Sequence, residues 1–421
     1  MMLHNICAIR GSIITFTLFL IFLLNPFADA LTGYLVGKGM MSENAAFSPS
    51  QIFRLFLTMI LFVQLKYRQK FYFFLVTVFY LLIIEFASFL LHQYPPGLLN
   101  GIISSYKLSF CLLFYLVIDN YVQNNKIGVS DIVRYFILSA TIYAVIILIS
   151  NILGINFDVY GDGLGSKGVF TSGNGLGIFI GVAGLFSLYA YLSERKKKEI
   201  IRLILFLYVL VNLLSKAAII LTLAILLISF YYSKRVYKFI IIVGGIALLA
   251  YYNSYVIELI TTTTSVVTYR YEHADSLRHF LLSGRVEYMD YAFEQYSLDG
   301  LLLLRLFFGM GYFVSFRNPY SNSFWEGSSS FLECEAFDMF FMYGLLGLLL
   351  YISLFIYILK KAMRIKGKYT SIFKIAWIVI FFHSAFAGHV LFNGMSIIAF
   401  VTILIVLNNY QIHNENSISV S

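Results

Sequence analysis

The sequence predicts an all-α polytopic membrane protein with about twelve transmembrane helices. Of its 421 residues, 60% are hydrophobic and only 12% are charged, which exceeds what a water-soluble core needs. Apolar runs long enough to cross a bilayer recur along the chain, separated by short polar tips. Because a bilayer tolerates no unpaired backbone polar groups, each run is expected to be a helix.

The predicted spans follow these apolar runs, with ends placed to within several residues. One start carries a capping pattern, in which Ser48 precedes Pro49 at the first helical position and Gln51 follows. The spans are 12–30, 50–65, 71–91, 100–118, 134–153, 172–192, 200–214, 217–232, 239–257, 334–358, 371–388 and 392–408.

Lysines and arginines indicate the orientation of the chain, because they accumulate in cytoplasmic loops. The short loops on one side hold only Lys38 and Lys167. Both termini are therefore predicted to be cytoplasmic, and the net charge of +9 reflects topology rather than nucleic-acid binding. The basic residues of the other side lie at Arg10, 66–70, 126–134, 195–202, 234–238 and 360–374.

The first apolar run has two interpretations. Arg10, the run itself and Ala28-Asp29-Ala30 imitate a cleaved signal peptide, but we favour an uncleaved first helix. The remaining topology is the same in both cases. The scattered cysteines indicate no disulfide framework and no metal spacing; they are Cys7, Cys111 and Cys334.

Three segments are predicted: helices 1–9 in residues 1–257, a large periplasmic loop in 258–332, and helices 10–12 with a cytoplasmic tail in 333–421. A loop of this length is usually functional or disordered, and its many aromatics argue against a disordered linker. Inside it, apolar and acidic residues alternate at helical spacing, which predicts an amphipathic helix on the outer membrane surface. The apolar face is Val286, Met289 and Phe293, and the acidic face is Glu287, Asp290 and Glu294.

Arg285 stands at the N-terminal end of that predicted helix, just after Ser283-Gly284. Free backbone N–H groups and the positive helix end favour an anion there, and a guanidinium binds phosphate in a fork. The alternative is a solvated arginine that pairs with Glu287 or Glu294. The other candidates of the loop for substrate binding are Arg278, His279 and Arg305.

Lys216 is the only charge in NLLSKAAII, and the span before it is shorter than the hydrocarbon thickness. We therefore expect it below the outer surface, where a cation is a functional candidate by default. The alternative is a lysine that snorkels at a helix end.

Acidic residues enter the tenth predicted span from its outer end. Glu335 and Asp338 share one helix face, a turn apart, and Glu333 precedes them. Buried carboxylates are costly unless they are paired or used, and they suit general-base chemistry. The alternative is a solvated helix start, where acids also suit the helix dipole. A second prediction concerns Glu85 and Lys107, which we expect to form an intramembrane ion pair that serves packing or the substrate path.

The order of these features resembles the O-antigen polymerase (Wzy-type) and O-antigen ligase families, membrane glycosyltransferases that use polyprenyl-pyrophosphate-linked sugars. Ser215-Lys216-Ala217 is similar to a Ser-Arg-Gly/Ala step at the outer end of a helix. Ser283-Gly284-Arg285 is similar to a Ser-Gly-Arg step that opens a helix in the external loop, and Gly309-Met310-Gly311 to a later Gly-x-Gly step. GVFTSGNGLG at 168–177 resembles a Gly/Asn-rich step before a span.

This chain departs from the ligase pattern at two of these positions. Lys216 replaces an arginine and would bind phosphate as a point charge. The ligases' histidine, ahead of a Gly-x-x-Gly step, falls on Glu333, ahead of Gly344 and Gly347. An acid there is more similar to the polymerases, where it would serve as base.

The resemblance implies a glycosyltransferase C-like fold and the polymerisation of undecaprenyl-pyrophosphate-linked oligosaccharides at the outer face of a bacterial inner membrane. It implies that Arg285 and Lys216 hold the pyrophosphate and stabilise its departure, with Glu333 as base. Arg278, His279, Arg305, Glu335 and Asp338 would line the substrate site. Expected partners are the lipid-linked substrate, membrane lipid, a chain-length regulator and a flippase.

No metal or other cofactor is expected, because the first external loop has only Glu43 as an acid and no His/Cys ligand spacing appears. The first competing interpretation is a flippase for lipid-linked oligosaccharides, which should show short loops throughout and two similar halves. The second is an O-antigen ligase, which shares the chemistry but transfers to the lipid A core.

Overall fold

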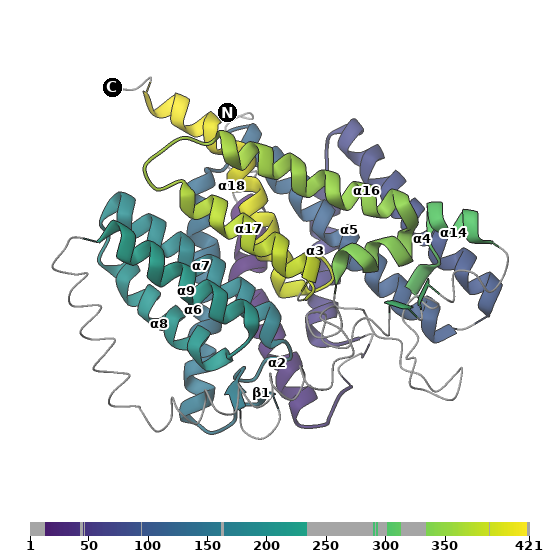
Figure 1. Ribbon diagram of the computed structural model, residues 1–421, viewed down its shortest axis with the longest axis horizontal. Coiled ribbons are helices and arrows are strands. Elements are labelled where there is room, and N and C mark those ends of the chain that lie inside the picture. Colours follow the sequence, from purple (N-terminus) through teal and green to yellow (C-terminus); the bar gives the residue numbers. More distant parts are fainter. Residues whose placement is uncertain are drawn as a thin grey trace, which may run out of the picture.

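The computed structural model describes a bundle of helices with one small hairpin (Figure 1). The residues that it describes are 13–42, 45, 47–93, 95–160, 164–233, 289–290, 292–293, 301–312, 334–386 and 388–418. The helices are η1 (Phe19–Leu24, a π-helix), α2 (Asn25–Gly37), α3 (Pro49–Gln64), α4 (Arg68–His92), α5 (Pro95–Gln123), α6 (Val129–Ile152), α7 (Gly173–Glu194), α8 (Lys198–Leu213), α9 (Lys216–Tyr232), α14 (Leu302–Phe308), α16 (Glu335–Arg364), α17 (Ser371–Phe386) and α18 (Gly394–Ile418).

The hairpin was not predicted. Strands β1 (Asp158–Tyr160) and β2 (Leu164–Ser166) pair antiparallel between α6 and α7, with Asp158 opposite Ser166. It packs against the end of α8. Strands of three residues are too short to give a hydropathy pattern, so the sequence offered no signal for them.

Every predicted span falls on a described helix, except 239–257, which lies outside the described residues. The predicted start after Ser48 is confirmed, because its hydroxyl accepts a hydrogen bond from the N–H of Gln51 at 3.3 Å. The described chain is that of an all-α membrane protein, whereas twelve spans and a glycosyltransferase C-like fold stay predictions. Within the described residues, six helices are long and apolar enough to cross a membrane: Ile13–Gly37, Arg68–His92, Pro95–Gln123, Val129–Ile152, Gly173–Glu194 and Glu335–Arg364.

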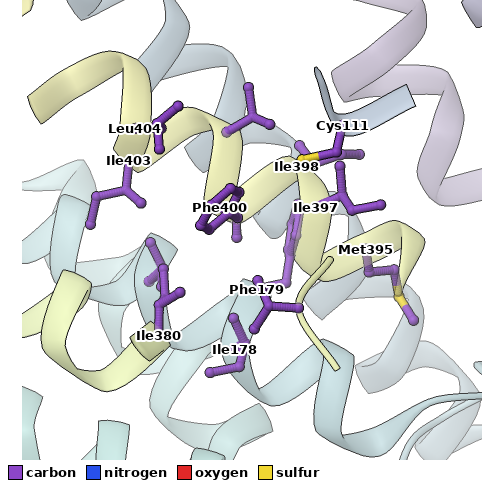
Figure 2. Packing of buried hydrophobic residues seen from close by; sticks show 14 of the residues in the cluster. Cys111, Ile178, Phe179, Ile380, Met395, Ile397, Ile398, Phe400, Ile403 and Leu404 are labelled. Atoms are coloured by element: carbon purple, nitrogen blue, oxygen red, sulfur yellow. The ribbon is translucent and has the colours of Figure 1, made fainter. Parts of the chain in front are cut away.

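Helix α18 forms the centre of the bundle and contacts α5, α6, α7, α16 and α17. It carries no charged residue from Gly394 to Leu407, and a helix that is apolar on all sides is buried. Figure 2 shows its side chains Ile397, Ile398 and Phe400 among Cys111 of α5 and Phe179 of α7. The start of α18 is therefore held from several sides.

Trp377 of α17 lies in the same core and is 1% exposed. Its ring centroid is 5.0 Å from that of Phe355 on α16 and 5.6 Å from that of Phe400 on α18. The three rings join α16, α17 and α18, the helices around the 388–393 loop.

Helices α7 and α9 approach each other closely along a glycine stripe. A Cβ at Gly181 would overlap Leu221, and one at Gly177 would lie 2.8 Å from the hydroxyl of Ser215. Small residues are the usual means of close helix contact in a membrane. The GVFTSGNGLG stretch therefore has a packing role at its end.

Polar contacts tie several helices together at one end of the bundle, which we call the basic end. Asp119 of α5 accepts hydrogen bonds from Lys70 of α4 at 3.3 Å and from Asn408 and Asn409 of α18 at 2.8 and 3.0 Å. Tyr232, at the end of α9, donates to the carbonyl of Lys368. The basic loops in the described ranges thus gather at one end, and which side of a membrane it faces stays a prediction.

Of the predicted amphipathic helix, Met289, Asp290, Ala292 and Phe293 are described and helical. Met289 of the predicted apolar face is buried and Asp290 of the acidic face is exposed, whereas Phe293 of the apolar face is 45% exposed. The ring of Phe293 lies 4.9 Å from that of Phe341 on α16. This part of the long loop therefore folds against a membrane helix.

Candidate functional site

The predicted site residues are only partly described. Arg278, His279, Arg285 and Glu333 lie outside the described residues, and their roles stay predictions. Lys216, Arg305, Glu335 and Asp338 are described, and each lies at the end of the bundle opposite the basic end, here called the opposite end. The local contacts decide what each of these four can do.

Glu335 opens α16 and is completely buried. Its Oε1 accepts hydrogen bonds from three successive backbone N–H groups, Val390 at 2.6 Å, Leu391, and Phe392 at 3.2 Å. Its Oε2 accepts one from the hydroxyl of Ser384. Three N–H groups converging on one carboxylate oxygen form an anion-binding nest, so Glu335 fixes the 388–393 loop.

Asp338 lies one turn along α16 from Glu335, as the spacing predicted, and is also completely buried. Its Oδ2 is 3.2 Å from Nε2 of His389, in the loop that Glu335 holds. The side chain of His389 is 18% exposed, so part of the imidazole is accessible to a ligand. A carboxylate that orients a partly exposed imidazole is the arrangement of a general base.

A second buried cluster surrounds Asp29 of α2. The carboxylate pairs with the guanidinium of Arg54 on α3, whose side chain is 12% exposed. It also accepts a hydrogen bond from the hydroxyl of Tyr143 at 2.5 Å and from the amide of Asn25 at 3.0 Å. A Cβ at Gly394, the first residue of α18, would overlap the Arg54 guanidinium. The Arg54 guanidinium thus lies against the N-terminal, positive end of α18.

Lys107 brings another positive charge to this region. Arg54 is the charged group that acts on it, and no carboxylate pairs with it among the described residues. Its neighbour Tyr106 contacts Thr58 of α3 at 3.1 Å between the hydroxyl oxygens, and Thr58 lies one turn after Arg54. Two like charges that act on each other favour a nearby anion.

The predicted ion pair between Glu85 and Lys107 is wrong. The carboxylate of Glu85 accepts a hydrogen bond from the N–H of Tyr312 at 3.0 Å and faces Gly101, where a Cβ would overlap it. Helix α5 begins at Pro95 rather than at residue 100 as predicted, so Lys107 lies deeper than expected. Gly101 and Lys107 are about 9 Å apart along the helix axis.

The 389–394 segment joins the two clusters. It begins at His389, beside Asp338, and ends at Gly394, against Arg54. Even fully extended, the five residue steps from 389 to 394 span at most about 18 Å. Helix α5 borders both clusters as well, because Cys111, one turn after Lys107, is an electrostatic neighbour of Glu335. A candidate base and two candidate anion-binding cations are therefore brought together at the opposite end.

No match to this chain was found. No protein-family model matches it, and neither does any curated protein or solved structure. Its function has to be argued from the chemistry of its own side chains.

Lys216 is the first residue of α9, with an exposed side chain. The preceding Ser215 caps the helix by accepting a hydrogen bond from the N–H of Ala218 at 3.3 Å. Ser215 also touches α7 near its start, where Ser172 accepts a hydrogen bond from the amide of Asn393 at 3.1 Å. A short series of contacts thus connects Lys216 to the 389–394 segment.

Arg305 lies on α14, which packs against a kink in α16 beside α4 (Figure 1). The kink is at Tyr343 and Gly344, and the latter has a φ of 65°. A Cβ at Gly344 would overlap the carbonyl of Phe307, and a Cβ at Gly309 would overlap that of Met342. The two glycine steps of the resemblance therefore contact each other, and their role here is close packing.

Arg54, Asp29 and His389 were not predicted as site residues. Arg54 is the only charged residue of α3, and Asp29 is the only one in 13–37. Lone charges inside apolar spans are functional candidates by default, and that signal was present. Asp29 was interpreted only as part of a cleavage-like Ala-Asp-Ala step. His389 has no such signal, since its partner Asp338 is far away in the sequence.

Proposed function

We propose that the protein is an O-antigen-polymerase-like glycosyltransferase that joins lipid-linked oligosaccharide repeat units at the outer face of a bacterial inner membrane. The observation that carries the proposal is the 389–394 segment, with a carboxylate-oriented histidine at one end and an arginine that is 12% exposed at the other. Glycosyl transfer from a pyrophosphate-linked sugar needs these two things, a base for the acceptor and positive charge for the leaving group.

In the proposed reaction, a sugar hydroxyl of one lipid-linked unit attacks the anomeric carbon of the glycan on another. The new carbon–oxygen bond forms as the bond to pyrophosphate breaks, and the leaving pyrophosphate takes the electron pair. The hydroxyl proton passes to the imidazole of His389, whose Nε2 lies 3.2 Å from Oδ2 of Asp338. Asp338 keeps the imidazole oriented and stabilises it once protonated. Glu333 remains the alternative base.

Arg54 and Lys107 are the proposed electrostatic partners of the leaving pyrophosphate. Both residues are partly buried, where weaker screening than in water strengthens their interaction with a developing negative charge. Arg54 lies against the start of α18, whose free N–H groups add to the positive potential. Arg285 and Lys216 are two further cations that we propose to hold the pyrophosphate of the donor. No metal or other cofactor is part of the reaction, and a chain-length regulator and a flippase are its expected partners.

The test uses a deletion strain and its surface polysaccharide, separated on a gel. We expect one repeat unit per lipid A core without the gene and a full ladder after complementation. A strain with no repeat at all would contradict the proposal and indicate a flippase or a ligase.

A substitution then tests the base. We expect His389→Ala to lower polymer formation by about 10²–10⁴-fold, the usual contribution of a general base, at unchanged protein abundance. The matched control is Phe386→Ala, in an exposed side chain near the same loop, which should keep the full ladder. Near-normal polymer from His389→Ala would remove this residue from the mechanism.

A further inference from the structure

A separate cavity of about 360 Å³ lies between α4 and α14, away from His389 and Lys107. The residues that line it recur at helical spacing on α4 and again on α14. The lining residues that the argument uses are Ala87, Ser88, His92, Leu304, Arg305 and Phe308.

The polar part of the lining suits an anion. Arg305 is 5% exposed, lines the cavity and acts electrostatically on His92 across it. The hydroxyl of Ser88 is buried and has no hydrogen-bond partner among the described residues, so it can donate to a ligand. Glu85, one turn away on α4, does not line the cavity, and one of its oxygens accepts from the N–H of Tyr312.

The apolar part of the lining adjoins exposed apolar side chains of both helices. On α4, Ile83 is 63% exposed, and on α14, Leu303 is 72% exposed. Helix α14 has the sequence LLLRLFF, in which Arg305 is the only polar residue. Apolar patches of this kind, at the edge of a membrane-spanning helix, are places where a hydrocarbon chain can lie.

We propose that this cavity binds the phosphate-bearing head of a polyprenyl lipid. The phosphate lies against Arg305 and His92, with a hydrogen bond from Ser88, and the isoprenoid chain follows the exposed faces of α4 and α14. That this lipid carries a repeat unit rests on the proposed function. A polymerase uses two lipid-linked substrates, and the cavity gives the second one a binding site of its own, distinct from the cations Arg54 and Lys107.

The test is photocrosslinking of the purified full-length protein with a photoreactive farnesyl pyrophosphate analogue, followed by mapping of the labelled peptides. We expect label in residues 80–92 or 301–310. Excess farnesyl pyrophosphate should suppress it, whereas farnesol and inorganic pyrophosphate should not. Suppression by inorganic pyrophosphate alone would show that the cavity recognises phosphate without the lipid, and label confined to other helices would overturn the proposal.

Two variants locate the binding. Ala87→Phe adds a ring to the cavity from an exposed position, so it should lower labelling at least tenfold without unfolding the protein. Its control, Val76→Phe, adds the same bulk at an exposed position of α4 outside the cavity and should label normally. Arg305→Gln should weaken labelling of residues 80–92 and 301–310. Unchanged labelling of Ala87→Phe would overturn the proposal.

The two proposals can fail separately. Crosslinking at α4 and α14 without any polymer in the complementation assay would leave the lipid site standing and remove the polymerase. The reverse is also possible. Absent crosslinks, together with normal polymer formation by Ala87→Phe, would remove the lipid site and leave the polymerase proposal standing.

Discussion

The pair of Asp29 and Arg54 carries a large desolvation cost. Taking both charges out of water costs several kcal/mol for each, and the attraction between them recovers this only with further hydrogen bonds. Tyr143 and Asn25 supply two of these to the carboxylate. Nε of Arg54 is buried and has no hydrogen-bond partner among the described residues. A group that is left with an unused donor at this depth is suited to a ligand.

Substitutions separate the folding role of the pair from its proposed chemical role. Arg54→Gln leaves the carboxylate of Asp29 without its counter-charge, and we expect a loss of stability of about 3–5 kcal/mol and low abundance. The double variant Arg54→Met with Asp29→Asn removes both charges and should recover most of the abundance. Polymer should nevertheless stay absent, because the cation is gone.

Abundance comes from an immunoblot of membranes, and polymer from the gel assay at matched protein levels. A normal ladder from the double variant would show that the pair serves folding alone.

At the level of single residues, sequence reasoning predicted faces better than partners. The spacing of Glu335 and Asp338 placed them correctly on one face, because helical periodicity is a local property. Their partners, Ser384 and His389, come from α17 and the loop after it, and no local pattern carries that information. The pairing of Glu85 with Lys107 failed because it depended on the exact residue at which α5 starts.

Among the elements, helix α16 is kinked at Gly344, and Gly309 packs against this kink. The carbonyl of Tyr343, in the kink, accepts a hydrogen bond from the hydroxyl of Tyr80 at 2.7 Å. The carbonyl of Phe341 accepts one from the N–H of Met310 at 2.9 Å. Helix α14 and helix α4 therefore satisfy groups that the kink frees, and α14 is held at the lipid cavity by this contact.

The kink can be tested with a matched pair of glycine substitutions. Gly344→Ala places a methyl group at a positive φ and into the carbonyl of Phe307. Gly154 also has a positive φ, of 64°, but nothing lies within 4 Å of its added Cβ. We expect Gly154→Ala to cost about 1–2 kcal/mol from the backbone alone, and Gly344→Ala to cost clearly more.

Thermal melting of the two variants in detergent provides the measurement. Equal shifts in melting temperature would mean that α14 does not dock against the kink.

For the whole molecule, the sequence predicted the positions of most helices along the chain but not how the helices pack together. Long apolar runs predicted where helices lie, since hydropathy depends on composition alone. They did not predict that α18, the last helix, would be central, or that α14, in the long loop, would be apolar and pack on α16. Such contacts depend on side-chain fit between segments far apart in the chain.

Topology is the prediction that belongs to this scale. With Cys7, Cys111 and Cys334 replaced by serine, we expect Met40→Cys to react with an impermeant thiol reagent in cells whose inner membrane is intact. Ser193→Cys, at the basic end, should react only after the membrane is opened. Both positions are exposed, so access to the reagent depends on the side of the membrane. The reverse pattern would turn the orientation around and put the proposed site on the cytoplasmic side.

The ring cluster around Trp377 gives the protein a natural optical probe. The chain has only two tryptophans, and the other, Trp325, can be replaced by phenylalanine. The remaining indole is buried between Phe355 and Phe400, at the junction of the helices that frame the loop of His389. Indole emission responds to small changes in its surroundings. The intrinsic fluorescence of Trp377 can therefore follow, in real time and without a label, how a bound substrate rearranges this junction.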